Sequence, residues 1–392
     1  MRERPAPAGQ GTGSLWALIA TGVAARLLVA VLTHGLPYDV DSFELVRRAL
    51  SAHPLHMYSL VNAGGSFHWP YPPGFLPLVV LSSDLADVLG GGFAQLIRIP
   101  SIVADATLSW LVWRGLEGRV DERSRLRAAA VVSLGPVFIA ISGYAAQIDS
   151  VAILPAAMGL LVWERSHHDH RAWIAGGLIG LGACIKTVPL LMLLALLPTA
   201  RSRQEAGILI GSAFAVLLLP LAPFLVADSS GALGIRHYAG APGMGGLSLV
   251  LQPNLAQLWL TRPVAPNHVI SWLFVKHPTV LNLATITAFA GYAWRFRPAP
   301  RPAAAVLWLM VLAFGSGFFF QYLIWVLPFL LLAGHIRAAT LLQAAITLPM
   351  LLFYVTAWRS DGIVPVYVAV MLIVWLGWVG VGAAIAKRGA FA

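Results

Sequence analysis

The 392-residue sequence is poor in charge and in cysteine. Only 11% of its residues are Asp, Glu, Lys or Arg, against about 25% in a typical soluble domain. One cysteine, Cys184, excludes an intramolecular disulfide. Lysine is also scarce, because only Lys186, Lys276 and Lys387 occur among the 26 basic residues. This composition excludes an ordinary soluble domain, and the arginine bias suggests a GC-rich bacterial genome.

Long apolar runs fill the chain instead, and 58% of the residues are hydrophobic. They predict an all-α polytopic membrane protein. The first run contains Arg26 and lacks a small-residue cleavage site, so we expect a retained span. About twelve spans are expected. The range is about 10–13, because two runs near Lys186 are shorter than a bilayer core requires. The runs lie at roughly 15–33, 93–114, 128–145, 150–164, 172–185, 187–199, 206–226, 279–294, 303–320, 322–334, 338–357 and 363–386.

The basic residues predict the topology. If segment 74–90 dips into the membrane and returns, 17 basic residues face the cytoplasm and 8 lie outside, as the positive-inside rule requires. This excess accounts for the formal charge of +10 without nucleic acid. We expect one domain over residues 1–392, cytoplasmic termini, and two long external segments at 34–92 and 227–278. The expected location is a bacterial plasma (inner) membrane.

Two carboxylates follow the first run, in "LPYDVDSFELVRRAL". Asp41 and Glu44 have the spacing of a capping box for a short helix over 43–52, so Asp41 has either a capping or a chemical role. Asp39 lies outside that predicted helix and has no capping role. We therefore expect Asp39 to be the functional carboxylate.

Further polar groups are expected at the outward ends of spans. Gln147 and Asp149 lie where two runs meet, and Lys186 separates two half-length runs. An ionisable group within a membrane is costly and usually functional, although Lys186 also fits a lysine that extends to the interface. Arg236 and His237 fit either a phosphate site or a solvated loop.

Aromatic and histidine clusters have two interpretations each. Phe67, Trp69 and Tyr71 fit an interfacial aromatic belt or a wall on which a sugar stacks. The run "HHDH" at 167–170 suggests metal binding, but it has no Cys or spaced partner and fits a polar turn better.

The ordered set of motifs resembles a known family. In sequence order they are "YDVDSF" (38–43), "WPYPPGFLPL" (69–78), "QIDSV" (147–151), "KTVPLLMLLALLP" (186–198) and "FFFQYLIWVLPFLLL" (318–332). The chain resembles the GT-C fold glycosyltransferases that use polyprenyl-phosphate-linked sugars. It is most similar to the PIG-M-like mannosyltransferases and their bacterial relatives.

The resemblance implies a membrane hexosyltransferase of cell-envelope glycolipid biosynthesis. The enzyme would move a sugar, mannose favoured, from a polyprenyl-phosphate donor to a hydroxyl of an external lipid or glycan acceptor, with inversion. Asp39 would be the general base and Asp41 the second motif carboxylate. Basic groups would hold the donor phosphate, and polar and aromatic groups would bind substrate. The first set is Lys186, Arg236, His237 and Arg98; the second is Trp69, Tyr71, Gln147, Asp149, Gln321 and Tyr322.

Three alternatives remain at this level. A divalent cation on Asp39 and Asp41 is chemically reasonable, although a lipid monophosphate leaving group does not require one, so we expect no obligatory cofactor. A lipid-sugar flippase without chemistry would line a path from both sides of the membrane. A scaffold protein would use the two external segments for docking. Neither of these proteins needs a carboxylate pair beside the proline-rich segment.

Overall fold

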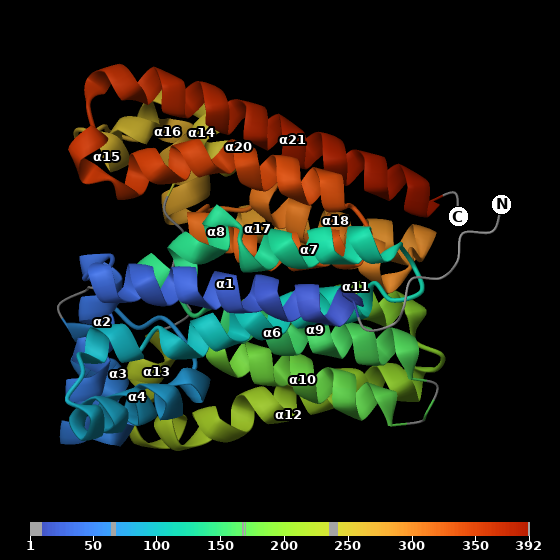
Figure 1. Ribbon diagram of the computed structural model, residues 1–392, viewed down its shortest axis with the longest axis horizontal. Coiled ribbons are helices and arrows are strands. Elements are labelled where there is room, and N and C mark those ends of the chain that lie inside the picture. The colour runs from blue at the N-terminus through green and yellow to red at the C-terminus, as the bar shows by residue number, and fades with distance from the viewer. Residues whose placement is uncertain (1–9, 64–67, 167, 169, 235–241, 391–392) are drawn as a thin grey trace.

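The structure is a computed structural model that describes residues 10–390, except 64–67, 167, 169 and 235–241. Every regular element in this part of the chain is a helix (Figure 1). The expected all-α class is therefore confirmed.

Six helical segments have the length and apolar composition to cross a membrane, which makes the chain a multi-pass membrane protein. A seventh arises if α16 and η9 (His268–Ile270, Ser271–Lys276) form one span with α17 (Pro278–Phe296), from which they are bent by 77°. The six are α1 (Gln10–Leu32), α5 with α6 (Phe93–Leu96, Ile99–Gly115), α7 with α8 and η4 (Glu122–Ser133, Pro136–Phe138, Ile139–Tyr144), α12 (Arg203–Ala227), α20 (Ile336–Tyr354), and η12 with α21 (Asp361–Ile363, Val364–Ala390).

The remaining apolar runs form shorter helices, and these build much of the core. All ten residues of α19 (Leu323–Leu332) are buried. A fully buried helix is apolar on every side whatever its length, so hydropathy alone does not separate it from a span. For this reason twelve spans are not observed. The other short elements are α9 (Asp149–Arg165), α10 (Arg171–Ile185), η5 with α11 and η6 (Val188–Leu191, Met192–Leu196, Leu197–Thr199), α18 (Pro300–Phe314) and η10 (Phe320–Tyr322).

The two long connecting segments gather at the end of the bundle opposite the termini (Figure 1). The first contains α2, η1, α3, η3 and α4 (Pro37–Ala52, Pro54–His56, Met57–Val61, Pro73–Phe75, Leu76–Leu89). The second contains α13, α14, η8 and α15 (Ser229–Leu233, Gly246–Leu251, Pro253–Ala256, Gln257–Leu260), and the short η11 (Thr356–Trp358) joins α20 to η12.

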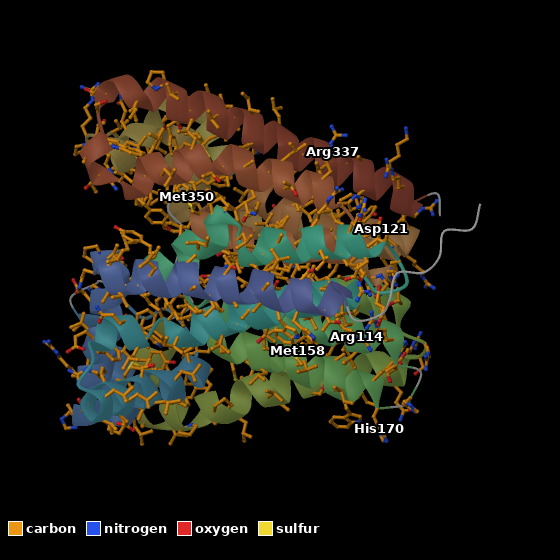
Figure 2. All side chains as sticks on the ribbon, viewed as in Figure 1. Arg114, Asp121, Met158, His170, Arg337 and Met350 are labelled. Atoms are coloured by element: carbon orange, nitrogen blue, oxygen red, sulfur yellow. The ribbon has the colours of Figure 1, made fainter. Side chains whose placement is uncertain are left out.

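The segment between α1 and α6 returns to the end that it left. Its longest apolar helix, α4, has 14 residues, or about 21 Å at 1.5 Å per residue, which is short of a hydrocarbon core of about 30 Å. Helix α6 then runs back, so that Arg114 lies at the end bearing the termini, as do Asp121, His170 and Arg337 (Figure 2). This course agrees with the topology expected from the charges.

Helix α2 begins earlier than its sequence pattern suggested. It starts at Pro37, and Leu36 occupies the N-cap position without a side-chain cap. A proline at the first helical position has a backbone angle already suited to the helix and lacks an N–H that would need a partner. The predicted helix over 43–52, the cap at Asp41 and the position of Asp39 outside the helix are therefore wrong.

Candidate active site

Two adjoining cavities lie among the candidate residues, and Pro70 and Tyr71 line both. The first, here called the Asp39 cavity, has a volume of about 410 Å³. It is lined by Leu36, Tyr38, Asp39, Ser42, Phe43, His68, Trp69, Pro70, Tyr71, Gln147, Met244, Trp259, Phe319, Phe320, Gln321, Phe353 and Tyr354. The second, the Lys186 cavity, has a volume of about 620 Å³. Four predicted substrate-binding residues thus line the first cavity, and Tyr71 and Tyr322 line the second.

Asp39 occupies the first turn of α2 and faces the first cavity. Gln147 makes a side-chain hydrogen bond to it. Burial raises the pKa of the Asp39 carboxyl to about 7, and the charge of Asp149 acts in the same direction. The Gln147 hydrogen bond and the charge of Lys186 oppose this rise. A carboxylate with a pKa near 7 is suited to accept a proton at neutral pH.

Asp41 has a different environment, although it is only two residues from Asp39. Residues two positions apart on an α-helix point in directions that differ by about 200° around the helix axis. The Asp41 side chain is 67% exposed. His34 Nε2 lies 3.9 Å from its Oδ1. The two aspartates therefore do not form a paired site, and this arrangement gives no support to a shared divalent cation.

Gln147 is positioned by an irregular turn between η4 and α9. Element η4 is a π-helix, and Ala146 has a left-handed φ of 58°. The Ser101 hydroxyl donates to the Gln147 carbonyl at 2.7 Å. Irregular, buried backbone of this kind is found disproportionately at functional sites.

A buried network of hydrogen bonds around Asp105 contacts the segments on both sides of this turn. The Arg26 guanidinium contacts the Asp105 carboxylate at 2.8 Å, and both side chains are 1% exposed. Ser142 and Ser150 also donate hydrogen bonds to Asp105. Since these serines flank Gln147 and Asp149 in the sequence, Arg26 and Asp105 determine where the turn lies. Arg26 is thus an internal anchor of α1.

Asp149 and Lys186 form a buried ion pair. The ammonium Nζ lies 2.8 and 3.0 Å from the two carboxylate oxygens. Asp149 begins α9 and Lys186 follows the last residue of the antiparallel α10, so each charge also suits the helix dipole beside it. Trp325 Nε1 donates to Asp149 Oδ1 at 2.5 Å. The sequence identified both charged residues but did not predict that they form a pair.

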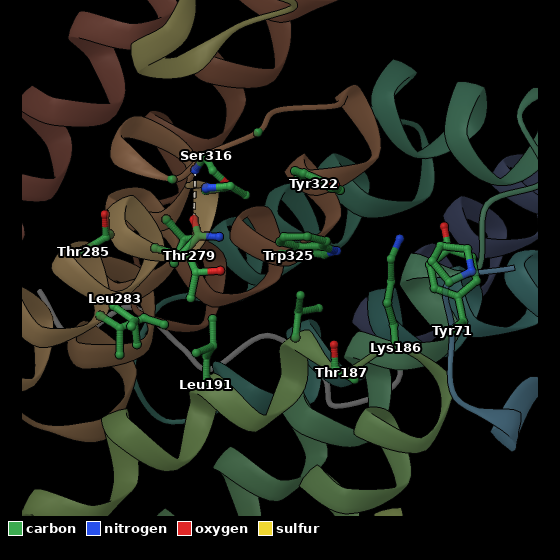
Figure 3. Close-up of a pocket in the computed structure, with 18 of the residues that line it drawn as sticks. Tyr71, Lys186, Thr187, Leu191, Thr279, Leu283, Thr285, Ser316, Tyr322 and Trp325 are labelled. Carbon is green, nitrogen blue, oxygen red and sulfur yellow. Dashed lines mark hydrogen bonds between the residues drawn. The ribbon is translucent and has the colours of Figure 1, made fainter. Parts of the chain in front are cut away.

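Aromatic rings enclose the Lys186 ammonium (Figure 3). Nζ lies 4.9, 5.8 and 5.6 Å from the ring centroids of Tyr71, Tyr322 and Trp325. Cation–π attraction stabilises the charge at such distances. These contacts do not fit a lysine that extends to the interface, and they keep the ammonium at the edge of the Lys186 cavity.

Other polar residues of this cavity carried no signal in the sequence. Lys276, Thr279, Asn282 and Ser316 line it together with Lys186. Two of the three lysines in the chain therefore meet in one cavity. The Lys276 ammonium has no hydrogen bond or ion pair to any of the described residues. It lies just before the bend between η9 and α17, so only the tertiary structure brings it near Lys186.

Arg98 lines neither cavity and is fully buried. Its guanidinium donates to the carbonyls of Ala30 at 2.8 Å and Thr33 at 3.1 Å, and also to that of His34. These are carbonyls at the C-terminal end of α1, which lack helical partners. The structure therefore makes Arg98 a cap for α1 and does not place it with the candidate phosphate-binding groups.

Trp69 is 1% exposed and packs on Phe43, Tyr71 and Phe75. An interfacial belt would place its ring at the membrane surface, so the belt interpretation does not hold for Trp69. Its indole Nε1 has no hydrogen-bond partner within the described residues. Because Trp69 lines the Asp39 cavity, this N–H is a candidate donor to a substrate oxygen.

Gln321 and Tyr322 occupy η10 and lead to different cavities. Gln321 lines the Asp39 cavity, whereas Tyr322 lines the Lys186 cavity and stacks on Trp325 with centroids 3.9 Å apart.

Arg236, His237 and Phe67 lie outside the described residues, as do two residues of "HHDH". The described residues contain no group of three or more His, Cys, Asp or Glu suited to a metal ion.

A sequence comparison gives these cavities a family context. Residues 69–317 match the family described as "Glycosyltransferase family 87". The match covers more than half of the chain, including the segments that carry Trp69, Gln147 and Lys186. No curated protein sequence matches the chain at a significant level.

Similar solved structures include ArnT from Cupriavidus metallidurans in the apo state, with 13% identity and a TM-score of 0.47 over 97% of this chain and 77% of that one. The apo oligosaccharyltransferase of Archaeoglobus fulgidus has 13% identity and a TM-score of 0.45. So does AglB from the same organism in complex with an inhibitory peptide and a dolichol-phosphate. In each of the last two comparisons, 96% of this chain covers 56% of the other.

Proposed function

The chain belongs to glycosyltransferase family 87, and we propose that it transfers one sugar, mannose favoured, from a polyprenyl-phosphate donor to a hydroxyl of a lipid or glycan acceptor. One observation carries the proposal. A carboxylate whose pKa is about 7 lies in one cavity, and a buried ammonium lies at the edge of the adjoining cavity. A proton acceptor and a phosphate partner on either side of Tyr71 are what such a transfer requires.

Asp39 is the general base in this proposal. The acceptor hydroxyl attacks the anomeric carbon of the donor sugar while Asp39 accepts its proton. The bond between the anomeric carbon and the phosphate oxygen breaks, and the polyprenyl phosphate leaves with the bonding electrons. A single displacement inverts the configuration at that carbon. No metal takes part in these steps.

Lys186 stabilises the phosphate as its negative charge grows. Asp149 and the three rings fix the ammonium beforehand, so no reorganisation is needed during the reaction. Trp325 Nε1 also donates a hydrogen bond to one carboxylate oxygen of Asp149. This hydrogen bond weakens the attraction between the carboxylate and the Lys186 ammonium. Lys276, in the same cavity, supplies a second positive charge for the phosphate. A charge-assisted contact in such a site is stronger than a neutral one.

The apolar lining of the Lys186 cavity suits the lipid part of the donor. The lining includes five aliphatic side chains, Val188, Leu191, Leu283, Ile286 and Val311. A polyprenyl chain needs apolar surface and no specific polar partners. The Asp39 cavity, with Trp69, Gln147 and Gln321, offers rings and amides that bind sugar or acceptor hydroxyls.

The site belongs on the external face in this proposal. Residues of α2 line the Asp39 cavity, and α2 lies at the end of the bundle opposite the termini (Figure 1). Arg114 and Arg337 lie toward the end that bears the termini (Figure 2). The positive-inside rule places the arginine-rich end in the cytoplasm. Family membership favours transfer over a flippase that performs no chemistry.

The direct test compares Asp39→Asn with Asp41→Asn in the purified full-length protein, assayed with polyprenyl-phosphate-mannose. We expect Asp39→Asn to lower turnover by at least about 10²-fold, which is the lower range for a general base. Asp41→Asn is the matched control and should retain turnover within about twofold of wild type, because its side chain is exposed. Full turnover in Asp39→Asn would refute the assignment.

A further inference from the structure

A third cavity lies away from the first two, between α7 and α20, and has a volume of about 740 Å³. Both helices belong to candidate spans. They begin at the end of the bundle that bears the termini, as the positions of Asp121 and Arg337 show (Figure 2). We call this cavity the α7–α20 groove. The proposed sugar transfer assigns it no role.

Two arginines line the groove without a partner. Arg127 of α7 and Arg337 of α20 are both exposed, and neither guanidinium group has a hydrogen bond or ion pair to any residue that the structure describes. The acidic groups that begin α7 are engaged elsewhere. Asp121 caps α7 through Ser124 at 2.9 Å, and Glu122 pairs with Arg125 at 2.6 Å. The two guanidinium groups therefore present uncompensated positive charge.

The rest of the groove is mainly apolar, and its exposed leucines belong to candidate spans. Val131 and Ile336 line its interior, and Leu134 and Leu341 on its rim are 38% and 58% exposed. Arg127 lies in the second turn of α7 and Arg337 in the first turn of α20. Helix ends at this depth meet the headgroup layer of a bilayer, while the leucines lie closer to its hydrocarbon.

Gln343 shows that the floor of the groove also accepts a polar atom. Its side chain is 4% exposed. Nε2 donates to the Val131 carbonyl at 3.0 Å, but Oε1 has no partner among the described residues. A buried acceptor without a partner is costly.

We propose that the α7–α20 groove is a binding site for an anionic phospholipid of the cytoplasmic leaflet. The lipid phosphate lies between Arg127 and Arg337, and an acyl chain covers Val131, Leu134 and Leu341. The guanidinium fork is well matched to phosphate oxygens, and the leaflet in which the positive-inside end resides carries anionic lipid. The site is separate from the donor site and lies toward the opposite end of the bundle.

The test measures lipid adducts of the detergent-solubilised full-length protein by native mass spectrometry. Dioleoyl-phosphatidylglycerol is compared with dioleoyl-phosphatidylcholine, which has the same chains and no net charge, and with inorganic phosphate. We expect retained phosphatidylglycerol adducts, with at least about tenfold weaker retention of phosphatidylcholine. Equal retention of both lipids would overturn the proposal, as would equal occupancy by inorganic phosphate, because a free anion would then suffice.

Variants locate the adduct. Arg127→Gln/Arg337→Gln should weaken phosphatidylglycerol retention by about tenfold or more, since each lost charge-assisted hydrogen bond costs about a factor of ten. The matched control is Arg203→Gln/Arg297→Gln, which removes two other exposed arginines whose guanidinium groups have no hydrogen bond or ion pair to the described residues. Equal losses in both double variants would refute the site, because they would indicate a general charge effect.

Ala130→Trp places a large ring in the groove without changing its charge and should displace the lipid. Wild-type retention in this variant would contradict an acyl chain in the groove.

Activity toward the polyprenyl-phosphate donor is measured in parallel for every variant that retains the wild-type Tm. Loss of the adduct with unchanged transfer supports a lipid site distinct from the donor site. Conversion of the protein to a different oligomeric mass with no lipid bound would indicate a second copy as the occupant and overturn the proposal.

Discussion

Lys186 Nζ lies 2.8 Å from Asp149 Oδ1, and the two side chains are 7% and 0% exposed. The pair joins the start of α9 to the end of α10 and lies beside the rings of Tyr71, Tyr322 and Trp325. It thus has both a structural and an electrostatic role. Variants of the two residues separate these roles.

Removing one partner of this pair should destabilise the protein more than removing both. Lys186→Met leaves a buried carboxylate and Asp149→Asn leaves a buried ammonium, and breaking a buried pair costs about 3–5 kcal/mol. The double variant should recover much of the lost Tm, because no unpaired charge remains. Activity should stay low in Lys186→Met and in the double variant. Tm measurements and donor KM and kcat check this, and recovery of turnover in the double variant would exclude a phosphate role for Lys186.

The activity should depend on pH through Asp39. Its pKa of about 7 means that the carboxylate is mostly protonated below pH 6 and mostly ionised above pH 8. We therefore expect kcat/KM to rise with pH and to level off above an apparent pKa of about 7. A pH series from 5 to 9 checks this. A flat profile over this range would indicate another base.

Asp39 should also lower stability at alkaline pH. Burial raises the pKa of its carboxyl above the ordinary value of 3.8. As pH rises, the unfolded chain therefore ionises at lower pH than the folded state does. The contribution to stability is therefore lost as pH rises between about 4 and 7. Asp39→Asn removes this penalty, and its Tm at pH 8 should equal or exceed that of wild type. A large decrease in Tm would mean that the Asp39 carboxylate is needed for folding.

Gln147 acts through Asp39, so Gln147→Leu should change the pH profile. The Gln147 hydrogen bond lowers the pKa of Asp39 against the effect of burial. Its loss should move the rising limb of kcat/KM to higher pH, by roughly one pH unit for about 1.4 kcal/mol. A merely structural effect would lower the rate at every pH and leave the apparent pKa in place. Gln147→Glu is a less useful variant because it adds a charge.

Lys276 should contribute to donor binding. Lys276→Gln removes one of the two positive charges of the Lys186 cavity, and we expect donor KM to rise about tenfold, as for one charge-assisted contact. Lys387→Gln is the control, because Lys387 is exposed near the end of α21, at the end of the bundle bearing the C-terminus (Figure 1). Equal kinetics in both variants would remove Lys276 from the donor site.

Composition and charge by themselves determined the class of protein. Scarce charge and repeated apolar runs are sufficient for a multi-pass α-helical membrane protein, because a bilayer core tolerates little else. The uneven distribution of arginines predicted which connections between helices lie at the same end of the bundle. The sequence separated Asp39 from Asp41 on the premise that Asp39 lies outside the helix and Asp41 caps it. That premise is wrong, because α2 begins at Pro37 and contains both residues.

Tertiary structure decided which residues meet. Buried short helices such as α19 look like spans in the sequence, because burial in protein and burial in lipid both select apolar residues. Arg98 looked like a phosphate ligand but caps α1, and Lys276 carried no signal although it shares a cavity with Lys186. The Asp149–Lys186 pair, the pKa of Asp39 and the α7–α20 groove all arise from contacts between distant segments. Sequence periodicity describes one helix at a time and contains no information on such contacts.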